Sequence, residues 1–165
     1  MNIRPAVISD IQAIRNMACL TWPEAYVHIL SGKQVSYMLN MMYHPARLLK
    51  QMEKEGHLFL IAEVNASPVG FAGFSEDKPG YWKLHKIYVL PEMHGRSIGK
   101  ALINEVIAIT WKNGAARLSL NVNRHNKAFD FYLHNGFVKV AEADIDIGNG
   151  FFMQDYILEK DLSVR

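Results

Sequence analysis

The sequence is nearly free of cysteine and has no long uninterrupted run of apolar residues. A single thiol, Cys19, among 165 residues excludes an internal disulfide, and this scarcity is typical of proteins in a reducing compartment. No segment is apolar over the length of a membrane span, and the N-terminus carries no apolar signal region. We therefore expect a soluble, cytoplasmic chain without a membrane partner, in which Cys19 is a buried structural thiol of a helix.

An excess of charge of one sign is also missing. The 18 lysines and arginines stand against 16 acidic residues, and no basic run would attract a nucleic acid. The seven histidines are scattered without the spacing of metal ligands, so no metal site is expected. Half of the residues are hydrophobic, which is a globular composition, and the length predicts a single domain over residues 1–165.

The apolar periodicity predicts an α/β (α+β) fold with a mixed, mainly antiparallel sheet of about seven strands flanked by helices. Ser9 and Gln12 have the spacing of a capping box that opens the first helix. The pattern stays helical from Pro23 to Glu55, with breaks near residues 31–32 and 44–45. Strands are expected at 2–8, 58–64, 69–75, 81–90, 118–122, 137–143 and 151–159, and further helices from 98 to the stop at 113–114 and over 126–134.

A loop with two glycines, residues 94–99 (His-Gly-Arg-Ser-Ile-Gly), lies between a strand and a helix. This order of strand, glycine loop and helix is typical of phosphate-binding sites, because the first N–H groups of the helix point at the anion. A Walker loop needs four residues between its glycines, but only three separate Gly95 from Gly99, and Ala101 follows Lys100. The glycine pattern of dinucleotide sites is also absent, so a nucleotide hydrolase is disfavoured.

The loop resembles the pyrophosphate loop of the GCN5-related N-acetyltransferases, written Gln/Arg-x-x-Gly-x-Gly/Ala. His94 replaces the usual Gln or Arg, and Ser97 replaces the middle glycine. Residues 120–137 resemble the second motif of this family, a strand ending in Val-Asn and then Asn-x-x-Ala-x-x-Phe-Tyr-x-x-x-Gly-Phe, with Asn126 one residue nearer to Ala128 than usual. The two motifs lie in the right order, and the resemblance covers residues 58–160.

The resemblance implies acetyl-CoA as co-substrate and a fold of this family. The backbone of the strand before the loop would pair with pantetheine, and the loop would hold the pyrophosphate. The hydroxyl of Ser97 suits a helix N-cap, and the ring of His94 could donate to a phosphate. The implied binding residues are Ile87, Tyr88, Val89, His94, Gly95, Arg96, Ser97, Ile98, Gly99, Lys100, Asn123 and Asn126.

Tyr132 stands where many relatives have a tyrosine that protonates the departing CoA thiolate. A phenol with a pKa near 10 is a plausible donor to a thiolate whose conjugate acid lies at roughly 8.5. The alternative is that Tyr132 belongs to the helix core, as we expect of Phe129 and Phe131. The carboxylate that serves some relatives as a base has no counterpart in residues 81–86, so His85, Glu24 or solvent remain as proton acceptors.

The resemblance thus implies an acetyl-CoA-dependent N-acetyltransferase in which a primary amine attacks the thioester directly within a ternary complex. A small amine or polyamine is favoured, because residues 22–30 and 155–160 are similar to bacterial polyamine acetyltransferases. A peptide or protein N-terminus remains open as acceptor, as does a non-catalytic acyl-CoA sensor. An exposed edge at the C-terminal strands could form a homodimer. Trp22, Glu24, Tyr26 and His28 could line the amine site or belong to an amphipathic surface helix. Met38, Met41 and Met42 are expected in the core, with the wall of a substrate pocket as the alternative.

Overall fold

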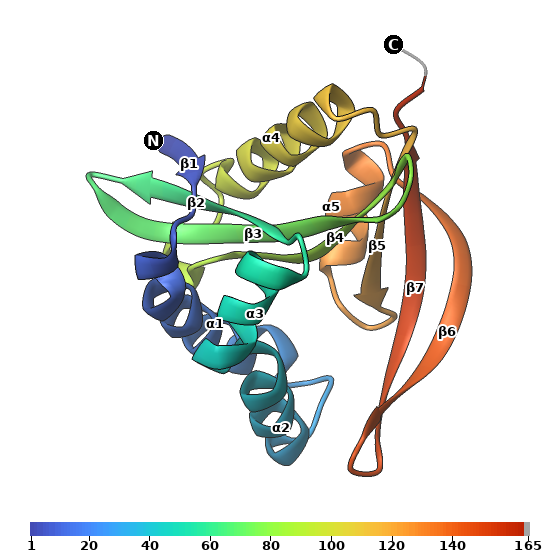
Figure 1. Ribbon diagram of the computed structural model, residues 1–165. Helices are drawn as coiled ribbons and strands as arrows, with labels where there is room; N and C mark the ends of the chain where they lie inside the picture. The colour runs from blue at the N-terminus through green and yellow to red at the C-terminus, as the bar shows by residue number, and fades with distance from the viewer. Residues whose placement is uncertain (164–165) are drawn as a thin grey trace.

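The computed structural model describes residues 1–163, which form one seven-stranded sheet with helices on both faces (Figure 1). The strand order is β1-β2-β3-β4-β5-β7-β6, and among these neighbours only β4 and β5 run parallel, so the predicted mixed, mainly antiparallel sheet is confirmed. The elements are β1 (Asn2–Pro5), α1 (Ile11–Tyr26), α2 (Gly32–Tyr43), α3 (Pro45–Lys54), β2 (Leu58–Val64), β3 (Ser67–Lys78), β4 (Tyr81–Val89), α4 (Ile98–Lys112), β5 (Arg117–Asn123), α5 (Ala128–His134), β6 (Val138–Gly148) and β7 (Phe151–Asp161), with short 3-10 turns at Ile8–Asp10 and Pro91–Met93.

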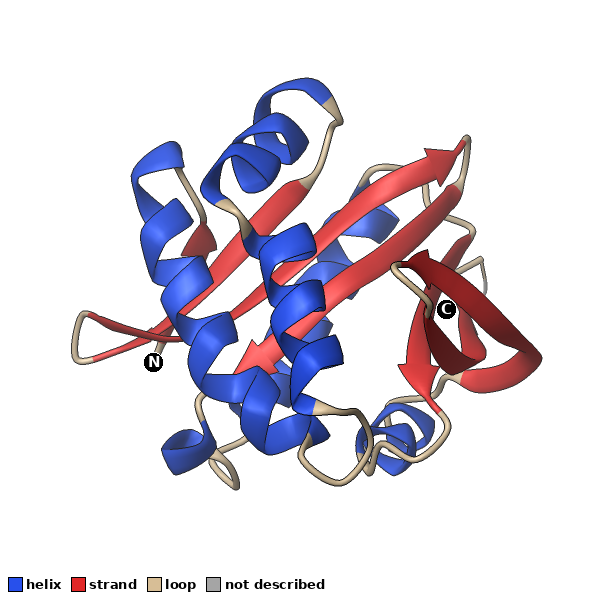
Figure 2. Cartoon of the chain, turned by 90° about the horizontal axis from the view of Figure 1, so that it is seen from below, coloured by secondary structure: helices blue, strands red, loops and turns tan. Residues whose placement is uncertain are grey.

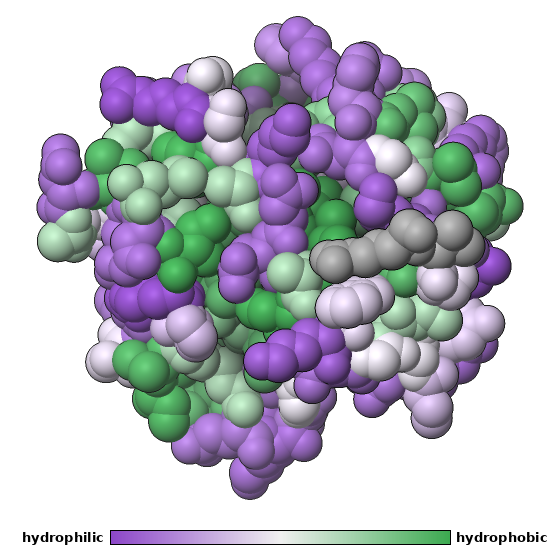
Figure 3. Space-filling view, turned by 90° about the horizontal axis from the view of Figure 1, so that it is seen from above, coloured by the Kyte–Doolittle hydropathy of each residue, from purple (hydrophilic) through white to green (hydrophobic). Residues whose placement is uncertain are grey.

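The sheet separates two hydrophobic cores. Helices α1, α2 and α3 cover one face, as the view from below shows (Figure 2), and Trp22 and Phe71 are buried there. Helices α4 and α5 cover the other face, where Leu102 and Val106 are fully buried. On the side seen from above, hydrophobic residues are scattered among hydrophilic ones (Figure 3). None of the helices within residues 1–163 is long and apolar enough to cross a membrane.

A bulge in β4 opens the sheet near its centre. Lys86 pairs with Gly73 and Leu84 pairs with Phe74, so His85 between them has no partner in β3. A bulge bends its strand and increases the local twist. The parallel pairing with β5 ends at once, since Leu84 and Leu120 form the last pair. Beyond this point β4 and β5 diverge, and one edge of residues 85–89 is left without a neighbouring strand.

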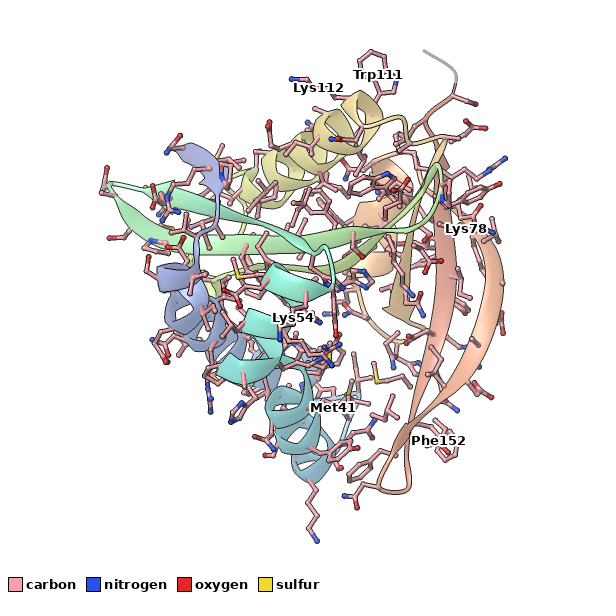
Figure 4. All side chains as sticks on the ribbon, in the orientation of Figure 1. Met41, Lys54, Lys78, Trp111, Lys112 and Phe152 are labelled. Carbon is pink, nitrogen blue, oxygen red and sulfur yellow. The ribbon has the colours of Figure 1, made fainter. Side chains whose placement is uncertain are left out.

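The hairpin of β6 and β7 reaches down beside α2 (Figure 1). Its tip is fixed to that helix, because the Tyr37 hydroxyl donates to the carbonyl of Ile147 at 2.8 Å and the Gln34 amide donates to the carbonyl of Phe152 at 2.8 Å. Met41 on α2 lies between the helix and the hairpin, and Phe152 lies near the hairpin tip (Figure 4). The hairpin therefore forms a wall beside α2, on the face of the sheet that α1, α2 and α3 cover.

Four local expectations are wrong. The first strand, predicted over 2–8, ends at Pro5, and the strand predicted over 137–143 continues to Gly148. Cys19 is exposed rather than buried, since it lies on α1 beside the fully buried Ala18 but on the solvent side. Ser9 does not open the helix: it lies in a 3-10 turn, and α1 begins only at Ile11. The Asp10 carboxylate takes the local N–H instead, accepting from Val7 at 2.8 Å, because an ion pair with Arg4 at 2.8 Å fixes it in place. The predicted breaks at 31–32 and 44–45 are confirmed, with Ser31 capping α2.

Candidate active site

The divergence of β4 and β5 opens a cavity of about 840 Å³, called here the first cavity. The end of β4, the 91–100 loop, the end of β5, α5 and the last turn of α1 form its walls. Of the residues that the sequence singled out, this cavity is lined by Glu24, Tyr26, His28, His85, Ile87, Tyr88, Val89, His94, Gly95, Ser97, Ile98, Gly99, Lys100, Asn126 and Tyr132, whereas Arg96 and Asn123 are not among its lining residues.

The 94–99 loop turns sharply so that its backbone faces the first cavity. Gly95 and Ser97 both have left-handed backbone angles, with φ of 78° and 59°. The carbonyl of Ser97 accepts the N–H of Ala101 at 3.0 Å, and the N–H groups of the first turn of α4 have no partner within the helix. This geometry favours a phosphate at the N-terminus of α4. The Ser97 hydroxyl forms no cap bond, so the expectation that it caps the helix is wrong.

His94 ties the loop to the preceding strand. Its Nε2 lies 2.9 Å from the carbonyl oxygen of Val89, and since a carbonyl only accepts, this ring nitrogen is the donor. Only the other ring nitrogen, Nδ1, is left for a ligand. The backbone of Ile87, Tyr88 and Val89 pairs with β3 along one edge and borders the first cavity with the other.

Tyr132 lies on α5 with 8% of its surface exposed. Its ring packs edge-on against Phe131 and Phe137, at centroid distances of 5.3 and 6.0 Å. Burial, and secondarily the charge of Tyr26, raise the pKa of the Tyr132 phenol above its ordinary value. The hydroxyl is therefore protonated at neutral pH, and the residue borders a cavity that a ligand can enter.

Aromatic side chains of α1 reach across to β4. The hydroxyls of Tyr26 and Tyr88 lie 3.2 Å apart, and the Trp22 ring packs at 4.6 Å from Tyr26 and 5.9 Å from Tyr88. Burial raises the pKa of both tyrosines. These three rings form part of the partition between the first cavity and a second one.

The second cavity, of about 440 Å³, lies on the α1–α3 face of the sheet, and the β6–β7 hairpin forms one of its walls. Met38, Met41 and Met42 all line it, and the expectation of a core position holds for Met38, which is 4% exposed, and for Met42, which packs against the core of this face, but not for Met41. Met41 is 39% exposed, and Met42 is half-buried. The two cavities share the residues Tyr26, Leu84, His85, Lys86, Tyr88 and Asn121.

Two buried charges in the second cavity were missed by sequence reasoning. Lys86 is 4% exposed, donates only to the Gln51 side chain at 3.3 Å, and has its pKa lowered to about 8 by burial. Asp155 is 6% exposed, accepts from the Asn121 amide at 3.3 Å, and has its pKa raised by burial. Neither belongs to a family motif. The alternation of residues along β7 could have indicated the burial of Asp155, because Asp155 lies on the same face of the strand as the apolar residues Met153 and Ile157.

His85 is held in the bulge by its neighbours. Its Nε2 lies 2.8 Å from the Ser75 hydroxyl, and its ring stacks on that of His57 at 4.5 Å. Burial, and then the charges of His57, Lys86 and Lys83, lower the pKa of His85 to about 3. The ring is therefore neutral but takes up a proton poorly. Glu24, the other predicted proton acceptor, is exposed on α1 at the wall of the first cavity.

The two predicted asparagines shape the turn between β5 and α5. Asn123 accepts the N–H of His125 at 3.0 Å and lines the second cavity rather than the first. Asn126 accepts the N–H of Ala128 at 2.9 Å, at the start of α5. Both side chains thus use their carbonyl oxygens locally, and Asn126 also hydrogen-bonds Tyr26, which opposes the larger effect of burial on the pKa of that phenol.

The comparison with known families decides the identity. Residues 27–160 match the acetyltransferase (GNAT) domain family. The chain belongs to this family. As a GNAT acetyltransferase it is an enzyme that uses acetyl-CoA, in agreement with the exposed backbone of β4 and the anion-binding geometry at α4.

Related proteins fit this assignment of the GNAT chain. The spermidine N(1)-acetyltransferase of Thermoplasma acidophilum is 29% identical over 93% of this chain and 96% of its own length. A crystal structure of the PaiA N-acetyltransferase from Thermoplasma acidophilum in complex with coenzyme A superposes with a TM-score of 0.83, at 27% identity over 97% of this chain and 98% of that one. The ribosomal-protein-S18-alanine N-acetyltransferase of Escherichia coli shares the fold alone, with a TM-score of 0.75 at 19% identity over 99% of this chain and 95% of that one.

Proposed function

We propose that this enzyme transfers the acetyl group of acetyl-CoA to a small primary amine, with a polyamine as the favoured class, in a ternary complex. The observation that carries the proposal is the pair of cavities that meet at the β4 bulge. A thioester that follows β4 from the first cavity meets an amine that enters from the second. The similarity to a spermidine N(1)-acetyltransferase supports the polyamine class.

The proposed roles follow from the position of each group. The loop N–H groups and Lys100 hold the pyrophosphate, and the free edge of residues 87–89 pairs with pantetheine. A backbone N–H of the same edge stabilises the oxyanion that forms when the amine nitrogen attacks the carbonyl carbon. When the carbon–sulfur bond breaks, Tyr132 donates its proton to the thiolate. Its buried, protonated phenol suits this step.

The test is the release of free CoA thiol from acetyl-CoA with a panel of amines. The panel contains butylamine, butane-1,4-diamine, spermidine, a set of amino acids and a peptide with a free N-terminus. We expect thiol release with the small amines, and initial-rate lines that intersect, because both substrates bind before any product leaves. If CoA binds but no amine in the panel releases thiol above background, the proposed acceptor class is wrong and the proposal fails.

A further inference from the structure

We propose that Asp155 binds the ammonium group of the acceptor in the second cavity and takes the proton that the amine loses before it attacks. This proposal rests on the proposed function, because it assigns a role in the same site. It also supplies the proton acceptor that the strand before the loop lacks, since residues 81–86 contain no carboxylate.

The first argument is that the Asp155 carboxylate is buried but poorly satisfied. The side chain is more than nine-tenths buried in the wall of the second cavity. Its Oδ2 accepts only the long bond from Asn121, at 3.3 Å, and its Oδ1 has no hydrogen-bond partner among the described residues. An ionised carboxylate can accept about four hydrogen bonds. Its second torsion is broad, so either oxygen can turn toward a donor in the cavity.

The second argument is that the fold supplies no counter-ion in contact with this carboxylate. Lys83 on β4 and Arg124 after β5 lie near enough to lower its pKa, and Tyr26 on α1 also faces it. Arg124 is already bound to Asp144 of β6 at 2.8 Å, with Glu142 at 3.9 Å. Within residues 1–163 no salt bridge joins Asp155 to any cation. An ammonium group from the substrate would fill this role.

The third argument compares Asp155 with the other candidates for proton acceptor. His85 is bound to Ser75, and with its pKa at about 3 it is a weak base. Glu24 lines the first cavity but not the second. Asp155 lines the second cavity and contacts Asn121, which belongs to both cavities, so it stands beside the place where they meet.

The proton balance closes with the groups named. The ammonium gives one proton to Asp155, and the neutral amine then attacks the thioester carbon. The carbon–sulfur bond breaks, Tyr132 protonates the thiolate, and the second proton of the acylated nitrogen replaces the one that Tyr132 has lost. Asp155 finally returns its proton to water. Burial raises the proton affinity of this carboxylate, which favours the first transfer.

The test compares Asp155→Asn, which keeps the shape and removes the charge, with the control Asp77→Asn, which removes an exposed carboxylate of β3 that lines neither cavity. The probes are spermidine and butylamine, and their binding to the CoA-loaded enzyme is measured by calorimetry. We expect Asp155→Asn to weaken amine binding at least about tenfold and to lower kcat/KM by about 10²-fold. The control should stay within about twofold of wild type on both measures, and CoA binding should be unchanged in both variants. Amine binding and turnover within about twofold of wild type in Asp155→Asn would overturn the proposal.

A measurement on the wild type guards against a variant that does not fold. The carboxyl carbon of Asp155 is followed by NMR through a pH titration of the CoA-loaded enzyme, with and without spermidine. A bound ammonium favours the ionised form, so the pKa of Asp155 must fall when spermidine is added. An unchanged pKa, or no binding of either amine to the wild type, would refute the role of Asp155. The absence of thiol release alone would refute only the proposed function.

Discussion

Replacing Lys86 by methionine should stabilise this protein at neutral pH, although the lysine is one of its most deeply buried polar residues. Its ammonium lies over the rings of Tyr43 and Phe59, at 5.6 and 5.7 Å, and donates to the Gln51 side chain at 3.3 Å. The carboxylate whose charge acts on it belongs to Glu55, which is already bound to Arg47 at 2.7 Å. The charge is therefore desolvated without an ion pair among the described residues.

The magnitude follows from the lowered pKa. Burial takes the pKa of Lys86 from 10.5 to about 8. One pKa unit corresponds to about 1.4 kcal/mol, so the charged form loses about 3 kcal/mol of folding free energy relative to the neutral form. This cost is fully present below the folded pKa and is relieved as pH rises from about 8 toward 10.5, because over that range the unfolded chain binds more protons than the folded one.

The assay is urea unfolding of wild type and Lys86→Met at a series of pH values between about 7 and 10. The advantage of the variant should shrink over this range by about 2 to 3 kcal/mol. Comparing pH values cancels the lost bond to Gln51 and the change of shape, which are the same at every pH. Lys54→Met, which replaces an exposed lysine on α3, is the control and should show no such slope. A stability difference that stays constant with pH would refute a destabilised ammonium at position 86.

Three further outcomes test the site. Tyr132→Phe should lower kcat by about 10²-fold and leave CoA affinity unchanged, whereas unchanged turnover would remove Tyr132 from the mechanism. Gly99→Glu should abolish CoA binding measured by calorimetry, because its carboxylate stands against the pyrophosphate. A Cβ at this glycine meets the Phe131 ring only at 3.6 Å, so the fold should survive, and normal CoA affinity would mean that the loop does not hold the pyrophosphate. Asp155→Asn should raise the thermal midpoint at about pH 7 and have little effect near pH 3. The raised pKa of Asp155 makes its contribution to stability largest below the ordinary value of 3.8, and this contribution is lost as pH rises through the folded pKa. A lower midpoint for the amide variant at pH 7 would contradict that sign.

The sequence predicted the order of the helices and strands because this order depends on local patterns, whereas an opening between β4 and β5 was implied only by the resemblance to the family. The strand and helix order follows from apolar periods, and the loop is recognised by residues that are neighbours in the chain. Local rules failed where tertiary contacts decide between residues of equal propensity. Ser9 and Asp10 are both good capping residues. The ion pair with Arg4 selects Asp10, and Arg4 is itself bound to Glu63, which lies 59 residues further along the chain.

The bulge in β4 and the contact of the hairpin with α2 could not be predicted from local rules, for a different reason. Nothing in the run from Leu84 to Lys86 marks His85 as unpaired, because a bulge is a property of the register between two strands. The contacts of Gln34 and Tyr37 with the hairpin join residues more than 100 positions apart. Since the hairpin supplies one wall of the second cavity, its lining could not be derived from spacing along the chain.

The charges of the second cavity support a site for an amine rather than a defect of packing. Asp155 and Lys86 line one cavity with opposite charges, Lys86 from β4 and Asp155 from β7, which pairs with β5. A fold optimised for stability alone would pair them or replace them with apolar residues, since an unpaired buried charge is costly. They are instead held apart, each with one neutral amide as its hydrogen-bond partner. Local conflicts of this kind are expected where a protein recognises a ligand. If Asp155 acts as proposed, the carboxylate attracts the ammonium that reacts, and Lys86 opposes a second ammonium on its side of the cavity. An extended polyamine would then enter with its reacting end at Asp155 and its other ammonium groups away from Lys86.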